Sequence, residues 1–163
     1  MFALDYIYRR GGTTVKRAER SMAEAVKNIV YTTINAVYPH YYPEGAVRFF
    51  LEHHGEESIL RDISAGKVYI LSDESGLPAG TVTINGNDIG RLFVLPAYQG
   101  KGLGGELLRF AEEAVFAKYD EAVLDSSLPA KGIYLKKGYV PVKYTTLEAN
   151  GDWLCFDTMV KKR

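Results

Sequence analysis

The chain has 163 residues, 47% of them hydrophobic and 25% charged, which is typical of one folded globular domain. Its 20 basic and 20 acidic residues balance, so there is no overall positive field to attract nucleic acid or a membrane surface. The single Cys155 excludes an internal disulfide, no apolar run approaches the length of a membrane span, and residues 1–10 lack a secretory pattern. We therefore expect a cytoplasmic protein.

The N-terminal part of the chain divides at Gly11 and Gly12. Residues 1–12 are interpreted as an N-terminal extension, and residues 13–163 as a single domain that opens with a strand over 13–18. No repeat, linker or low-complexity segment interrupts that domain.

Three helices are predicted next. Ser21-Met-Ala-Glu24 matches a capping box, which predicts that the first helix begins near Ser21, and its apolar stripe ends before Pro39. Two shorter helices are expected over 43–54, where Pro43 suits a first turn, and over 56–65.

The remaining pattern alternates strands and helices. Strands are predicted over 67–72, 79–85, 89–95, 121–126, 139–147 and 153–161, and helices from the glycines near 102 to about 119 and over 129–137. Hairpins thus surround a single strand–helix–strand crossover. This order predicts a central mixed sheet and not the repeated βαβ units of a doubly wound fold.

The stretch Arg91–Gly105 joins an apolar run to a helical pattern through a loop rich in glycine. A ligand can approach the main chain closely at these glycines because they carry no Cβ. The first amides of the helix have no intrahelical acceptor and lie at the positive end of its dipole. The stretch therefore predicts a ligand that bears phosphate.

Three phosphate motifs compete for this loop. A nucleoside-triphosphate loop needs Ser or Thr after its Gly-Lys pair, but Gly102 follows Lys101. The dinucleotide pattern GxGxxG is matched by Gly100, Gly102 and Gly105, with Asp125 about 20 residues further on, yet Pro96-Ala-Tyr-Gln99 separates the strand from the first glycine. The third pattern, (Gln/Arg)-x-x-Gly-x-(Gly/Ala), is matched by Gln99, Gly102 and Gly104.

The third pattern resembles the acyl-CoA loop of the GCN5-related N-acetyltransferase (GNAT) family, and the flanking Leu-Phe-Val-Leu-Pro-x-Tyr and Gly-Leu-Gly agree with it. The order of elements is similar to that family from about Thr13 onward. The resemblance implies an α/β (α+β) fold with a central mixed, mostly antiparallel twisted sheet of six to seven strands and about four helices. It also implies a splayed parallel strand pair at the acyl-CoA site.

The resemblance further implies where acetyl-CoA, as cosubstrate, would bind. The pyrophosphate would lie on the main chain of the glycine loop, and the pantetheine arm would pair with the preceding strand, where an amide also stabilises the oxyanion. The residues implied are Leu92, Phe93, Val94, Gln99, Gly100, Lys101, Gly102, Leu103, Gly104 and Gly105, with Ser127.

A second match, Ala130-x-x-x-Tyr134-x-x-x-Gly138-Tyr139, is similar to a segment of the same family that carries the general acid. Tyr134 takes that position. A phenol of pKa near 10 stays protonated at neutral pH and can protonate a departing thiolate. One departure from the family is Ser127, which stands where many members have Asn.

The base that deprotonates the acceptor amine is not singled out by the sequence. Asp88 and Asp125, at the ends of two neighbouring strands, are the candidate carboxylates, His40 is the candidate imidazole, and water-mediated proton removal is an equal alternative. The resemblance implies that the aromatic segment from Tyr38 to Tyr42 covers the acceptor site, and aromatic cover for the sheet edge is an equal alternative. The three histidines and Cys155 have no metal-site spacing, so no metal is expected.

These features predict an acetyl-CoA-dependent N-acetyltransferase that acts by direct attack of a primary amine. The acceptor, a small molecule or a peptide, is left open. A non-catalytic acyl-CoA-binding module and, less favoured, a dinucleotide-binding oxidoreductase are the alternatives, and the closing hairpin could pair two copies in a homodimer.

Overall fold

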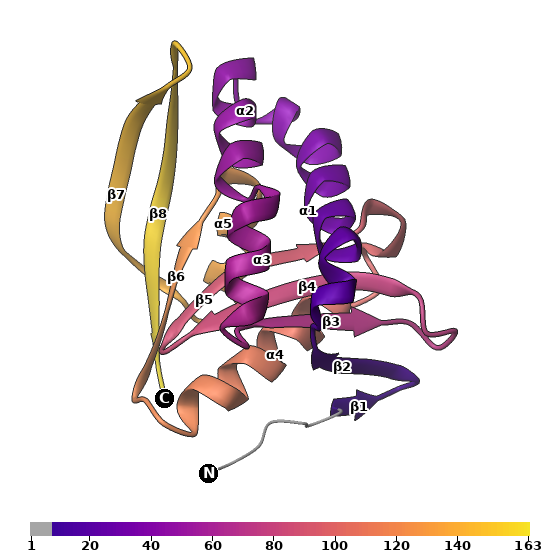
Figure 1. Ribbon diagram of the computed structural model, residues 1–163. Coiled ribbons are helices and arrows are strands. Elements are labelled where there is room, and N and C mark those ends of the chain that lie inside the picture. The colour runs from indigo at the N-terminus through magenta and orange to yellow at the C-terminus, as the bar shows by residue number, and fades with distance from the viewer. Residues whose placement is uncertain (1–7) are drawn as a thin grey trace.

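The computed structural model describes residues 8–163 (Figure 1). Residues 1–7, most of the predicted N-terminal extension, lie outside that part. The strands are β1 Tyr8–Arg10, β2 Thr13–Arg17, β3 Val68–Ser72, β4 Pro78–Asn85, β5 Asp88–Val94, β6 Glu121–Ser126, β7 Val140–Ala149 and β8 Asp152–Lys162. The α-helices are α1 Ala23–Val37, α2 Glu44–His53, α3 Glu56–Ser64, α4 Leu103–Phe116 and α5 Leu128–Lys136.

The strands of residues 8–163 form one sheet in the order β1-β2-β3-β4-β5-β6-β8-β7. Every neighbouring pair is antiparallel except β5 and β6. The mixed, mostly antiparallel sheet is therefore confirmed. It has eight strands in the described part, more than expected, because Tyr8–Arg10 adds an edge strand against β2.

The parallel pair separates almost as soon as it forms. Asp88 is paired with Val123, whose amide also donates to the Asn87 carbonyl at 2.9 Å. Beyond this point β5 continues beside β4, and β6 continues beside β8. The two strands thus splay apart, as the resemblance implied, and leave their edges available in the middle of the sheet.

Helices cover both faces of the sheet (Figure 1). On one face α1, α2 and α3 bury a cluster that includes Ile29, Ile59 and Phe93. On the other face α4 and α5 bury a cluster that includes Leu107, Leu124 and Tyr139. These two apolar layers hold the splayed strands in place from both sides.

The first helix starts differently from the prediction. A 3₁₀ turn, Arg20–Met22, precedes α1, and no side chain caps the helix, so the predicted capping box is wrong. The Met22 amide donates to the Glu19 carbonyl at 2.8 Å. This backbone turn places Ser21 inside the turn, where its hydroxyl does not cap α1.

The turn between β7 and β8 is fastened to the start of α2, with which it lies side by side in Figure 1. The Gly45 amide donates to the Asp152 carboxylate at 2.7 Å, and the Asn150 side-chain amide donates to the Gly45 carbonyl at 3.2 Å. A Cβ at Gly45 would lie 2.7 Å from the Asn150 carbonyl oxygen, so only glycine allows this approach.

Candidate active site

The glycine loop presents main-chain amides at the start of α4. Gly100 and Gly102 have positive φ angles of 75° and 84°, a conformation that glycine adopts without strain, and a Cβ at either would meet nothing within 4 Å. The first intrahelical bond of α4 runs from the Glu106 amide to the Gly102 carbonyl at 3.1 Å. The amides of residues 103–105 therefore lie ahead of the helical hydrogen bonds, where an anion can accept from them.

A cavity of about 420 Å³ lies over this loop, and we call it the loop cavity. Of the predicted cofactor-binding residues, all except Lys101 line it. The Lys101 ammonium instead lies 5.4 Å from the centre of the Tyr98 ring. The Gln99 side chain donates to the Val94 carbonyl at 2.9 Å, so it fastens the loop to the end of β5.

Sequence reasoning missed a cation at this cavity. Lys137, at the end of α5, lines the loop cavity, and its Nζ lies 3.6 Å from where a Cβ of Gly105 would stand. It therefore adds positive charge at the same end of α4 as the free amides. The signal was present in the two lysines before Gly138, but a surface lysine at a helix end is usually only solvated.

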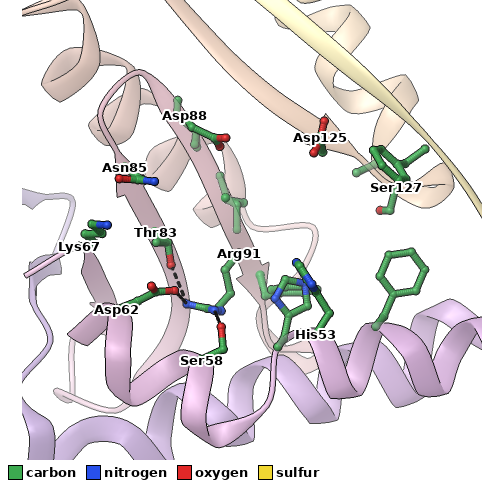
Figure 2. Close-up of a pocket in the computed structure, with 18 of the residues that line it drawn as sticks. His53, Ser58, Asp62, Lys67, Thr83, Asn85, Asp88, Arg91, Asp125 and Ser127 are labelled. Carbon is green, nitrogen blue, oxygen red and sulfur yellow. Dashed lines mark hydrogen bonds and ion pairs between the residues drawn. The ribbon is translucent and has the colours of Figure 1, made fainter. Parts of the chain in front are cut away.

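A second cavity, of about 450 Å³, opens where the ends of β3 to β6 meet α2 and α3 (Figure 2). We call it the strand-end cavity. The two cavities meet between the splayed strands, at a junction formed by the residues that line both, which are Tyr38, Leu92, Phe93, Ser127, Ala130 and Tyr134. The two cavities thus adjoin at these residues.

Tyr134 is placed at this junction by α5. Its side chain is buried, and its ring packs against Tyr139 with centres 5.7 Å apart. Burial raises the pKa of the Tyr134 phenol, with a smaller contribution from Tyr38, so the hydroxyl keeps its proton over the physiological range. The position and the protonation state both suit a proton donor.

Tyr38 is a second buried phenol at the junction. Burial raises its pKa, and a hydrogen bond with the Ser127 side chain opposes that rise. Ser127, which departs from the usual family residue, thus has a partner from the segment that was expected to cover the acceptor. Tyr42 of the same segment accepts from the Leu128 amide at 2.7 Å and donates to the Cys155 carbonyl at 3.0 Å, so it joins α5 to β8.

The predicted carboxylates Asp88 and Asp125 both line the strand-end cavity and point toward each other across the gap (Figure 2). The Thr158 hydroxyl donates to Asp125 at 2.6 Å. Partial desolvation, with repulsion from Asp125, raises the pKa of Asp88 above its usual range. The predicted imidazole, His40, is exposed and lines neither cavity.

A bulge in β5 turns Arg91 into the strand-end cavity, which sequence reasoning did not foresee. Arg91 has a φ of 44°, and the pairing of β4 with β5 shifts register there. Ile89 faces the α4 side of the sheet, whereas Arg91 faces α3. The Arg91 guanidinium forms an ion pair with Asp62 at 2.9 Å and donates hydrogen bonds to Thr83 and Ser58. The extra residue thus reverses the alternation of faces.

Two further kinds of functional element are absent from the described part of the chain. Between residues 8 and 163, no helix is long and apolar enough to cross a membrane. In the same residues, His, Cys, Asp and Glu side chains form no group of three that could hold a metal ion.

The family of the chain follows from a comparison with known domains. The acetyltransferase (GNAT) domain family matches residues 37–163, which is most of the chain. The chain therefore belongs to the GNAT acetyltransferases. A comparison with curated proteins found no match.

Solved structures of this family share the fold. A GCN5-related N-acetyltransferase from Rhodopseudomonas palustris superposes with a TM-score of 0.83 at 23% identity, over 97% of this chain and 98% of that one. The PaiA N-acetyltransferase of Thermoplasma acidophilum, solved with coenzyme A, gives 0.71 at 19% identity, over 93% and 99%. The ribosomal-protein-S5-alanine acetyltransferase of Vibrio fischeri gives 0.70 at 17%, over 97% of each chain.

Proposed function

We propose that this chain transfers the acetyl group of acetyl-CoA to a primary amine by direct attack, without a covalent enzyme intermediate. The observation that carries the proposal is the meeting of the two cavities at Tyr134 between the splayed strands. The loop cavity holds the acyl donor and the strand-end cavity holds the amine. The composition supports a cytoplasmic location for this reaction, and the amine is that of a small molecule or a peptide.

The loop cavity fits coenzyme A. The amides of residues 103–105 and the open glycines suit a diphosphate, and Lys137 adds a compensating charge. The edge of β5 at Leu92–Val94 suits the pantetheine arm, because splaying has freed that edge from β6. An amide of this edge also lies beside the junction, where it would stabilise the oxyanion that forms at the thioester carbonyl.

Two proton transfers accompany the reaction. Asp88 accepts the proton of the incoming ammonium, directly or through water, and its raised pKa makes it a better base than an ordinary aspartate. Tyr134 donates its proton to the departing thiolate of coenzyme A. Tyr38 and Ser127 position the reacting groups at the junction through their hydrogen bond.

The test is amine-dependent release of free thiol from acetyl-CoA. A transferase releases thiol in proportion to the added amine and forms the acetylated amine, which mass spectrometry detects. A non-catalytic acyl-CoA-binding module would bind acetyl-CoA in calorimetry but would release no thiol with any amine. Saturable NADH binding without coenzyme A binding would instead support the oxidoreductase alternative and would refute the proposal.

A further inference from the structure

The charged residues of the strand-end cavity are divided between its two ends. Across the strand ends these residues lie in the order Asp125 on β6, which is nearest the junction, Asp88 at the start of β5, and Lys67 just before β3, with Asn85 of β4 between Asp88 and Lys67 (Figure 2). Arg61 of α3 also lines the cavity; its side chain is 69% exposed, and its Nε lies 3.9 Å from the Asp62 carboxylate. The cavity thus has an acidic end and a basic end.

Arg91 and Asp62 also line this cavity, but they do not alter that division of charge. Arg91 and Asp62 form an ion pair at 2.9 Å with side chains that are 6% and 19% exposed, so each neutralises the other. Lys67, in contrast, forms no ion pair within residues 8–163. Its ammonium is therefore available to a ligand.

The sheet fixes how far apart the two ends are. Asn85 on β4 is paired with Asp88 on β5, and the carbonyl of Lys67 accepts from the Ile84 amide at 2.9 Å. Lys67 therefore lies two strands from Asp88, a separation of about 10 Å at the main chain. On the other side, Asp125 is two residues from Ser127 at the junction, which is about 7 Å along β6.

Part of the wall of the strand-end cavity is apolar. Phe49 and Phe50 of α2 and Phe93 of β5 line it. Burial, with the neighbouring charge of Arg91, lowers the pKa of His54 to about 3, so this imidazole is neutral and adds no charge to the wall. A run of methylene groups can therefore cross the cavity without losing hydrogen bonds.

We propose that the acceptor is a primary amine that also carries an anionic group several bonds away, as in an amino acid, with the amine at Asp88 and Asp125 and the anion at Lys67. This inference rests on the transferase function proposed above and names its substrate class. The acidic end attracts the ammonium to the junction. The basic end attracts a carboxylate and repels the second ammonium of a diamine.

Three amines of matched length test the inference. In ε-aminocaproate and cadaverine, five methylene groups separate the reacting amine from a carboxylate and from a second ammonium, and n-pentylamine is the five-carbon amine with no second charged group. With the full-length protein and acetyl-CoA, kcat/KM for ε-aminocaproate should exceed that for n-pentylamine about fivefold, and cadaverine should be the poorest of the three. β-Alanine and γ-aminobutyrate extend the series to shorter chains.

Charge reversal at Lys67 identifies the end that makes the difference. Lys67→Glu should reverse the order of ε-aminocaproate and cadaverine, and Lys67→Met should bring the three amines close together. Lys118→Glu, the same change at an exposed lysine outside the cavity, should leave the order unchanged. Thermal unfolding of each variant checks that it is folded.

The outcomes separate the two proposals. Thiol release that depends on amine but favours cadaverine or n-pentylamine overturns the substrate class and leaves the transferase function intact, as does an order that Lys67→Glu and Lys67→Met do not change. Absence of amine-dependent release with every amine, including peptides with a free N-terminus, refutes the transferase function and the inference with it.

Discussion

The two cavities that meet at Tyr134 are built from different parts of the protein. The loop cavity owes its anion site to main-chain amides from one continuous stretch that ends at Gly105. The strand-end cavity owes its chemistry to side chains from α2, α3, α5 and the strands β4 to β8, which come together only in the folded sheet. A main-chain site can stay the same while the surrounding sequence changes, whereas a site made of side chains changes with single substitutions.

The largest effect is expected at the junction, which belongs to both cavities. Tyr134→Phe removes the proton donor and should lower kcat about 100-fold, with coenzyme A affinity nearly unchanged, because the ring and its packing remain. Steady-state thiol release and calorimetry measure the two quantities. Tyr139→Phe is the control. It removes the hydroxyl of a neighbouring buried ring that lines neither cavity, so kcat should stay at the value of the unchanged protein. An unchanged kcat in Tyr134→Phe would remove Tyr134 from the mechanism.

The next effect tests the side chains of the strand-end cavity. Asp88 must be ionised to accept a proton, so kcat/KM should fall as the pH is lowered through its raised pKa, at higher pH than for an ordinary aspartate. Asp88→Asn should remove this acid limb and lower kcat/KM about tenfold at neutral pH, since Asp125 and water remain. Asp120→Asn, outside the cavity, is the control. If the limb persists in Asp88→Asn and is lost in Asp125→Asn, Asp125 is the base.

A backbone substitution tests the main-chain character of the loop cavity. Gly102→Ala forces alanine into a left-handed conformation, at a cost of about 1–2 kcal/mol, and relief of that strain moves the amides, so coenzyme A affinity should fall about fivefold. Gly132→Ala adds the same methyl group to α5, where it also meets nothing within 4 Å, and should leave affinity unchanged. Equal affinity in the two variants would argue against recognition by the main chain.

The smallest effect concerns the side chain that assists the loop. Lys137→Gln should weaken coenzyme A binding about threefold at low salt, with the difference shrinking as salt is added, because this charge is exposed. Lys136→Gln changes the adjacent exposed lysine, which lines neither cavity, and is the matched control. A loss as large as that of Gly102→Ala would mean that side chains contribute as much to this cavity as the main chain does.

The sequence was informative where the determinants are local. The glycines and the apolar runs around them predicted the loop, α4 and the mixed sheet. Both signals are local, because a glycine that can adopt a positive φ indicates a loop and apolar residues at every second position indicate a strand. The position of Tyr134 on α5 followed from spacing within one segment. Most of the loop cavity could therefore be named before the fold was known.

The rest depended on contacts that are distant in the sequence. The bulge at Arg91 was not predicted, because nothing in an alternating strand indicates that an arginine adopts a positive φ. Tyr38 and Ser127 meet only because α1 and α5 converge on the junction. The capping box at Ser21 failed because a backbone turn from Arg20 to Met22 takes its place. The division of charge between Asp88 and Lys67 required the strand order.

The fastening of Gly45 to Asn150 and Asp152 has a mechanical consequence. It ties the N-terminus of α2, one wall of the strand-end cavity, to the β7–β8 hairpin, whose residues Leu147 and Phe156 form another wall. These two walls are therefore coupled, because a displacement of the hairpin turn is passed to the start of α2 through these hydrogen bonds.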